Sequence, residues 1–139
     1  MPQTHNVINV GRYKYILANH HRNRQNSNKS LWTITQTEEV ESFRLLCMNS
    51  WIVDNDKGWS IHRINNSNRI LGRSTQNDDV QIAKFVDSSN NQQWHGYPVD
   101  YRKSMHDRPK SKILKDWVRK GIIKRADMSK ILRGKGCTI

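Results

Sequence analysis

The sequence predicts an α+β fold, because three regions of the chain follow different periodicities. Residues 36–48 have the apolar spacing of an amphipathic helix, residues 51–99 alternate as strands do, and helical spacing returns after Pro109. We expect an antiparallel sheet of about five strands, one amphipathic helix packed on it, and a basic helical hairpin at the C-terminal end. With 139 residues, the chain is predicted to form a single domain, 1–139.

The first helix has a clear start signal. Thr35 and Glu38 have the spacing of a capping box, in which each residue accepts a hydrogen bond from the backbone of the other. Val40, Phe43 and Cys47 then recur at intervals of three and four residues, so they share the side of the helix that faces the core. Cys47 is interpreted as a small buried thiol. The two cysteines are too few for a disulfide framework, which favours an intracellular, cytoplasmic location.

The remaining N-terminal and central segments predict strands and turns. Residues 6–17 alternate fairly regularly and indicate a strand or hairpin. Residues 19–30 contain no apolar and no acidic residue, so we expect a mobile basic loop. Residues 54–58 indicate a turn between two strands, and the region up to residue 99 an antiparallel meander.

Residues 109–136 are predicted to form the helical hairpin. Ile113, Leu114 and Trp117 fall on one side of its first helix, Gly121 ends that helix, and a second short helix follows. We expect Trp117 to be a core residue rather than a platform for a stacked base.

The positive charge of the chain is concentrated at this hairpin. Residues 101–139 contain thirteen Lys and Arg against three acidic residues, which accounts for ten of the twelve net positive charges. Such a field attracts polyanions, and the primary hypothesis is therefore a nucleic-acid-binding protein, for RNA or DNA, that contacts the phosphate backbone. The alternatives are a cationic face that serves only solubility and an adaptor or inhibitor that binds an acidic protein surface. The predicted phosphate-binding residues are Lys112, Lys115, Arg119, Lys120, Lys124, Arg125, Lys130, Arg133 and Lys135.

A second functional hypothesis comes from the residues around position 95. The candidate catalytic residues are His95, Tyr97, Arg102 and His106. Histidine transfers protons near neutral pH, tyrosine or arginine can stabilise developing negative charge, and Gly96 would let a phosphate approach the backbone. These groups suit a small metal-independent ribonuclease, such as a toxin. Each of them also has a structural use, for example a histidine bonded to a backbone carbonyl.

Other classes of protein have little support in the sequence. It contains no Walker loop, no GxGxxG and no GxSxG motif, and residues 54–58 resemble a calcium loop only in part, because the glycine comes one position early. His20 and His21 are adjacent, so their side chains would diverge on a regular element, and a zinc site there is weakly supported. We therefore expect no metal and no cofactor. No apolar stretch is long enough for a membrane span.

Overall fold

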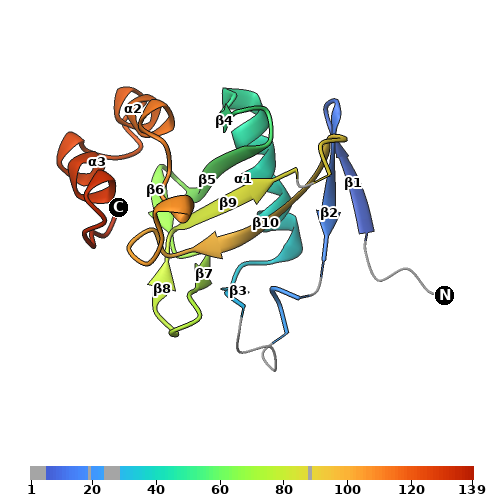
Figure 1. Cartoon of the computed structure of the whole chain (residues 1–139), viewed down its shortest axis with the longest axis horizontal. Helices are drawn as coiled ribbons and strands as arrows, with labels where there is room; N and C mark the ends of the chain where they lie inside the picture. The colour runs from blue at the N-terminus through green and yellow to red at the C-terminus, as the bar shows by residue number, and fades with distance from the viewer. Residues whose placement is uncertain (1–5, 19, 24–28, 88) are drawn as a thin grey trace.

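The chain folds around one large, mainly antiparallel sheet. The computed structural model describes residues 6–18, 20–23, 29–87 and 89–139, and within them it has the expected α+β class, with a sheet of several strands and three α-helices (Figure 1). The strands are β1 (Asn6–Val10), β2 (Tyr13–Leu17), β3 (Leu31–Trp32), β4 (Ile52–Val53), β5 (Lys57–Ile64), β6 (Ser67–Arg69), β7 (Gly72–Arg73), β8 (Asp79–Val80), β9 (Ile82–Val86) and β10 (Gln93–Val99).

The order of the strands places the N-terminal hairpin beside a strand from the second half of the chain. The main sheet runs β1-β2-β10-β9-β5-β4, with β6 paired to β5, and a smaller sheet runs β3-β7-β8. Neighbouring strands are antiparallel except for β2 and β10, which pair in parallel at Lys14 with Gln93 and Tyr15 with Trp94. The N-terminal hairpin of β1 and β2 therefore adds to the sheet beside a strand from the C-terminal half.

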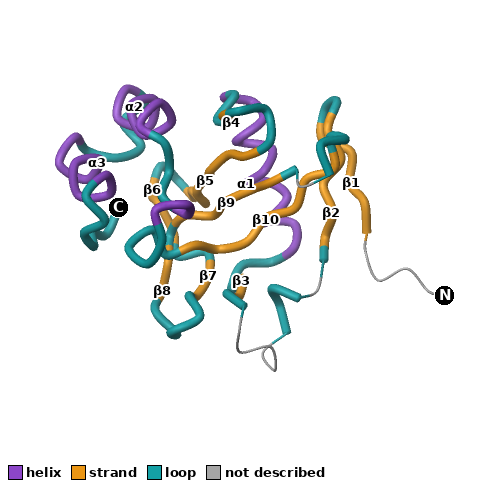
Figure 2. The backbone as a smooth tube through the Cα atoms, viewed as in Figure 1, coloured by secondary structure: helices purple, strands orange, loops and turns teal. Residues whose placement is uncertain are grey.

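The three α-helices lie on one face and at one end of the sheet (Figure 2). They are α1 (Gln36–Asn49), α2 (Ser111–Arg119) and α3 (Arg125–Leu132), together with the short 3-10 helix η1 (Met105–Asp107). The predicted capping box at the start of α1 is confirmed. The amide of Glu38 donates to Oγ1 of Thr35 over 3.1 Å, and the amide of Thr35 donates to Oε1 of Glu38 over 2.9 Å.

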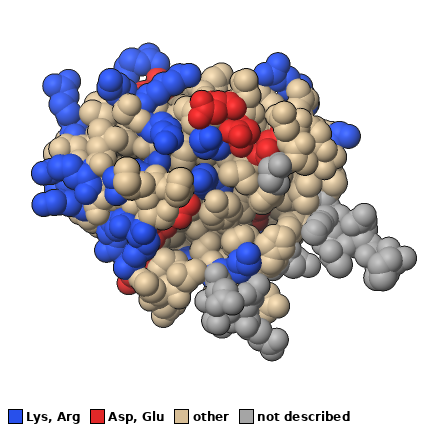
Figure 3. Space-filling model, in the orientation of Figure 1, with Lys and Arg blue, Asp and Glu red and all other residues tan. Residues whose placement is uncertain are grey.

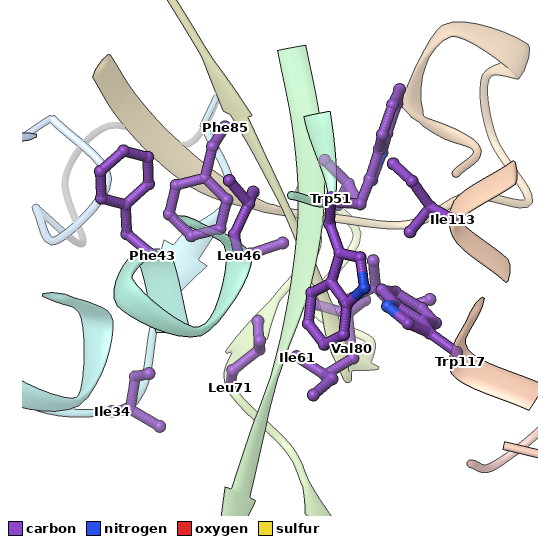
Figure 4. Close-up of a cluster of buried hydrophobic side chains, with 14 of the residues drawn as sticks. Ile34, Phe43, Leu46, Trp51, Ile61, Leu71, Val80, Phe85, Ile113 and Trp117 are labelled. Carbon is purple, nitrogen blue, oxygen red and sulfur yellow. The ribbon is translucent and has the colours of Figure 1, made fainter. Parts of the chain in front are cut away.

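Helix α1 covers one face of the sheet. Its Phe43 and Leu46 are fully buried, and the Phe43 ring lies 5.8 Å from that of Trp94 on β10 (Figure 4). Ser60 on β5 donates a hydrogen bond of 2.7 Å to the carbonyl of Ser42 on the helix. The predicted core face of this helix is thus confirmed at Val40 and Phe43, whereas Cys47 is only half-buried.

The C-terminal helices pack at the end of the sheet remote from β1 (Figure 1). Ile113, Leu114 and Trp117 of α2 are fully buried, and the Trp117 ring meets that of Trp51 edge to face at 5.6 Å (Figure 4). The prediction that Trp117 is a core residue is confirmed. Ile131 gives α3 its own buried anchor. The apolar side of α2 and Ile131 of α3 are therefore used by the core, whereas Leu132 at the end of α3 is exposed.

The face of the sheet opposite α1 is partly covered by η1. Trp59 and Ser60 are neighbours on β5 and so point to opposite faces. Ser60 contacts α1, while Nε1 of Trp59 donates to the carbonyl of Asp107 on η1 over 3.0 Å. On the adjacent strand, Nζ of Lys84 donates to the carbonyl of His106 over 2.7 Å. These bonds fix η1 beside the strand that carries His95 and Tyr97.

Candidate functional site

Strand β10 presents His95 and Tyr97 on the side opposite the core. His95 and Tyr97 are half-buried, whereas Trp94, which precedes His95, and Gly96, which lies between the two, are buried. The alternation follows from the pleat of the strand, which turns successive side chains to opposite faces. Since Trp94 packs against Phe43 of α1, the two candidate residues lie on the far side of the sheet.

The interpretation of Gly96 as a point of ligand approach is wrong. A Cβ atom at this position would lie 2.4 Å from the ring of Phe85 and 3.0 Å from the hydroxyl of Tyr15. Glycine is needed there because the aromatic core comes that close to the backbone of β10. The space beside Gly96 that a phosphate was expected to use is therefore filled by side chains of the protein.

A pocket of about 450 Å³ lies over His95 and Tyr97. Its walls come from segments that are distant in sequence. These are the turn at residues 20–21, residues 29–30, the turn at 74–75, and the chain from β10 to η1. Its lining residues are His20, His21, Lys29, Ser30, Ser74, Thr75, His95, Tyr97, Pro98, Val99, Asp100, Lys103 and Asp107. Three imidazoles, one phenol and two lysine side chains thus share one cavity.

His21 is the most tightly held of the three histidines. Its ring stacks on Tyr97, with centroids 5.2 Å apart and an interplanar angle of 16°. Its Nδ1 lies 3.0 Å from the carbonyl oxygen of Ser30. Burial lowers the pKa of His21 to about 4, so the ring is neutral near pH 7. Because a carbonyl only accepts hydrogen bonds, Nδ1 carries the hydrogen and Nε2 keeps a free electron pair.

His20 and His95 complete the cluster. The His20 ring meets that of His21 edge to face at 5.2 Å. Burial lowers the pKa of His95 below its usual value, and charge on His20 lowers it further. His20 and His21 lie in a turn and not on a helix or strand, so the divergence expected on a regular element does not apply to them.

A buried ion pair positions the turn that carries these histidines. Arg22 donates to Oε1 of Glu39 on α1 over 2.7 Å and to the carbonyl of Ile34 over 2.7 Å. The carboxylate of Glu39, only 2% exposed, also accepts a hydrogen bond from the hydroxyl of Tyr15. Burial raises the pKa of Glu39, while its bonds to Tyr15 and Arg22 oppose that rise. The residue next to His21 is thereby fixed to the helix on the other face.

The other two sequence candidates for catalysis lie elsewhere. Arg102 donates to both carboxylate oxygens of Asp100, at 2.9 and 2.7 Å, and to Asp78 at 3.3 Å. It lines a second pocket next to the C-terminal residues, which shares Val99 and Asp100 with the histidine pocket. These hydrogen bonds from Arg102 lower the pKa of Asp100. His106 is exposed on η1, outside the lining of the histidine pocket. The structure therefore joins His95 and Tyr97 to His21, and leaves Arg102 and His106 apart from them.

A second feature is the cationic face of α2, α3 and the residues after them. Figure 3 shows Lys and Arg gathered over these helices. Lys112, Lys115 and Arg119 follow one another at intervals of three and four residues and form a stripe along α2. All nine residues predicted to bind phosphate are exposed: Lys112, Lys115, Arg119, Lys120, Lys124, Arg125, Lys130, Arg133 and Lys135.

Two of these nine cations already have an acidic partner. Asp116 pairs with Arg119 and, over 2.8 Å, with Lys120. The hydrogen bonds that Asp116 accepts hold its pKa well below the usual range. The bond from Lys120 has the largest effect, and the bond from Trp51 the next largest. Within the described part of the chain, the other seven have no carboxylate within ion-pair distance. The uncompensated part of the face therefore comprises Lys112, Lys115, Lys124, Arg125, Lys130, Arg133 and Lys135.

The predicted basic loop at residues 19–30 falls partly outside the described residues, at 19 and 24–28. Its described ends, residues 20–23 and 29–30, contribute His20, His21, Lys29 and Ser30 to the pocket. The loop as a whole was expected to bind nucleic acid beside the helical hairpin, but none of these four residues is among the predicted catalytic or phosphate-binding residues. The only signal that could have marked them is the histidine pair itself.

Wider comparisons bear on neither feature. No protein-family model, curated protein or solved structure matches this chain significantly. Among the residues that the structure describes, no three His, Cys, Asp or Glu side chains converge as metal ligands would, and no helix is both long and apolar enough to cross a membrane.

Proposed function

We propose that the chain binds nucleic acid, RNA or DNA, through phosphate contacts made by the cationic face of α2 and α3. The observation that carries the proposal is the set of seven exposed cations without an acidic partner, four on α2 and α3 and three beside α3, on elements that buried side chains anchor in the core. Cations held on ordered elements can meet successive phosphates, and each contact releases bound counterions.

The packing of the helices supports this use of the face. Trp117, Ile113 and Ile131 anchor the helices in the core, so their outer sides are presented on a fixed backbone. Arg108 adds a further tie, since it donates to the carbonyl of Leu132 at the end of α3 over 3.1 Å. Backbone-type contacts from such a surface favour binding that tolerates many sequences.

The test is the salt dependence of binding to a single-stranded RNA and to a DNA duplex of equal length. Replacing Lys115, Arg125 and Lys130 by glutamine should lower the slope of log K against log salt for single strands by about 2, since each phosphate contact contributes about 0.7. A control with Lys14, Arg44 and Lys57 replaced by glutamine has the same change in net charge and should keep the slope.

Equal slopes for the two triple variants would contradict the proposal. A chain without salt-dependent binding to either nucleic acid would also contradict it, and an acidic protein surface would then be the class of partner to which the cationic face is complementary.

A further inference from the structure

The histidine pocket has the groups needed for chemistry at a phosphodiester, independently of the cationic face. His21 and His95 belong to different segments but line the same cavity, and Lys29 and Lys103 stand at its rim as exposed cations. The Nδ1 bond to Ser30 and the stack on Tyr97 fix the ring of His21 in one orientation. Fixed orientation of a proton acceptor is what acid–base catalysis requires.

We propose that this pocket cleaves RNA by internal transesterification, with His21 as the general base and His95 as the general acid. Nε2 of His21 takes the proton of the ribose 2′-hydroxyl, and the 2′-oxygen forms a bond to phosphorus. The bond from phosphorus to the 5′-oxygen breaks, and the leaving oxygen takes a proton from His95. The products are a 2′,3′-cyclic phosphate and a free 5′-hydroxyl, and one proton has passed from His95 to His21.

The substrate class follows from the groups present. A 2′-hydroxyl serves as its own nucleophile, so two imidazoles and nearby cations suffice for the step. Lys29 and Lys103 are placed to neutralise the phosphate, whose charge increases in the transition state. The lining also contains two carboxylates, Asp100 and Asp107. Asp100 already accepts two hydrogen bonds from Arg102.

The assignment of base and acid rests on how each histidine is held. The hydrogen bond from Nδ1 of His21 to a carbonyl leaves Nε2 as an acceptor, which suits the base. Burial lowers the pKa of both rings, and the His21 value of about 4 keeps this ring in the neutral form that a base needs. A bound phosphate would favour the charged form of the neighbouring His95, which suits the acid.

The experiment uses the full chain in EDTA with a dinucleoside phosphate, uridylyl-3′,5′-adenosine, and its 2′-O-methyl analogue. The unmodified substrate should yield the cyclic phosphate, and the analogue should remain intact. His21→Asn keeps a side-chain N–H for the Ser30 carbonyl but removes the base, and His95→Gln removes the acid. Each variant should lose about 100-fold or more in rate while keeping a cooperative unfolding transition.

The matched control is His106→Ala, which removes an exposed histidine outside the pocket and, prepared identically, should cleave at the rate of the unmodified chain. An intact dinucleotide, cleavage of the 2′-O-methyl analogue, or full activity in His21→Asn and His95→Gln would overturn the proposal. A dinucleotide is too short to depend on α2 and α3, so this result is separate from the outcome of the salt-dependence test.

Discussion

Nε1 of Trp51 donates a hydrogen bond of 2.8 Å to Oδ2 of Asp116, which links the segment between α1 and β4 to α2. The same carboxylate pairs with Arg119 and Lys120 on the outside of the helix. Asp116 thus joins the core to the cationic face, and it is the residue that limits how much of that charge is available to a phosphate.

The first prediction concerns this carboxylate. Asp116→Asn keeps an oxygen that can accept from Trp51 but releases Arg119 and Lys120, so the salt slope for single-stranded RNA should rise by about 1.4, or two phosphate contacts. The measurement is the same salt titration of affinity. Glu41→Gln, which removes the partner of Arg44 on α1 and changes the net charge equally, should leave the slope unchanged.

The second prediction concerns Trp117, which is fully buried. Trp117→Ala should lower the free energy of unfolding by about 3–5 kcal/mol, because it removes a large core side chain and leaves a cavity. Trp117→Phe should cost less, since it also removes a buried indole N–H for which the described residues provide no hydrogen-bond partner. Urea denaturation measures both values. A variant that unfolds like the parent but loses RNA binding would contradict the assignment of Trp117 to the core.

The third prediction concerns Arg22 and Glu39. Arg22→Met leaves the carboxylate of Glu39 buried without its cationic partner, so the free energy of unfolding should fall by about 3–5 kcal/mol. Combining it with Glu39→Gln should restore part of this loss, because the amide carries no charge and can still bond to Tyr15. Thermal and urea unfolding of the single and double variants give the comparison, and equal losses in both would contradict the charge argument.

The fourth prediction is a pH dependence of stability. The pKa of His21 is about 4 in the folded chain and near 6.5 when exposed. Between these values the unfolded chain binds more protons than the folded one, so the free energy of unfolding should fall as the pH drops below about 6.5. His21→Asn should flatten this part of the curve.

The measurement is urea unfolding of both proteins between about pH 5 and pH 8, where few carboxylates titrate. Part of the slope should remain in His21→Asn, because burial lowers the pKa of His95 in the same direction. Parallel curves for the two proteins would show that His21 is not held in its neutral form by the fold.

The features that the sequence predicts well are those determined by near neighbours. The capping box joins Thr35 to a residue three positions away, and the alternation along β10 depends only on the pleat of one strand. The same holds for the buried stripe of α2, since residues three and four apart share a side of a helix. Each of these signals lies inside a single element.

The histidine pocket could not be predicted in this way. His21 reaches Tyr97 because β3 and the turn before it lie across β10. Neither the two-residue strand β3 nor the turn has a repeating pattern of apolar residues from which its position could be predicted. Likewise, Arg102 is absent from the lining of the pocket, and its guanidinium is held by Asp100 together with Asp78, a residue 24 positions away. Such pairings depend on the order of the strands, which the local pattern of residues does not determine.

The parallel pairing of β2 with β10 also has a consequence for the order of folding. It joins Lys14 to Gln93, about 80 residues apart, through only two residue pairs, whereas β5, β9 and β10 are neighbours linked by longer antiparallel ladders. Closing a long loop costs entropy before its few contacts form, so the hairpin of β1 and β2 should join the sheet late. The turn with His20 and His21 follows this hairpin directly. The pocket is therefore assembled after the part of the core formed by β5, β9 and β10, and destabilising the hairpin should disturb the pocket before the rest of the domain unfolds.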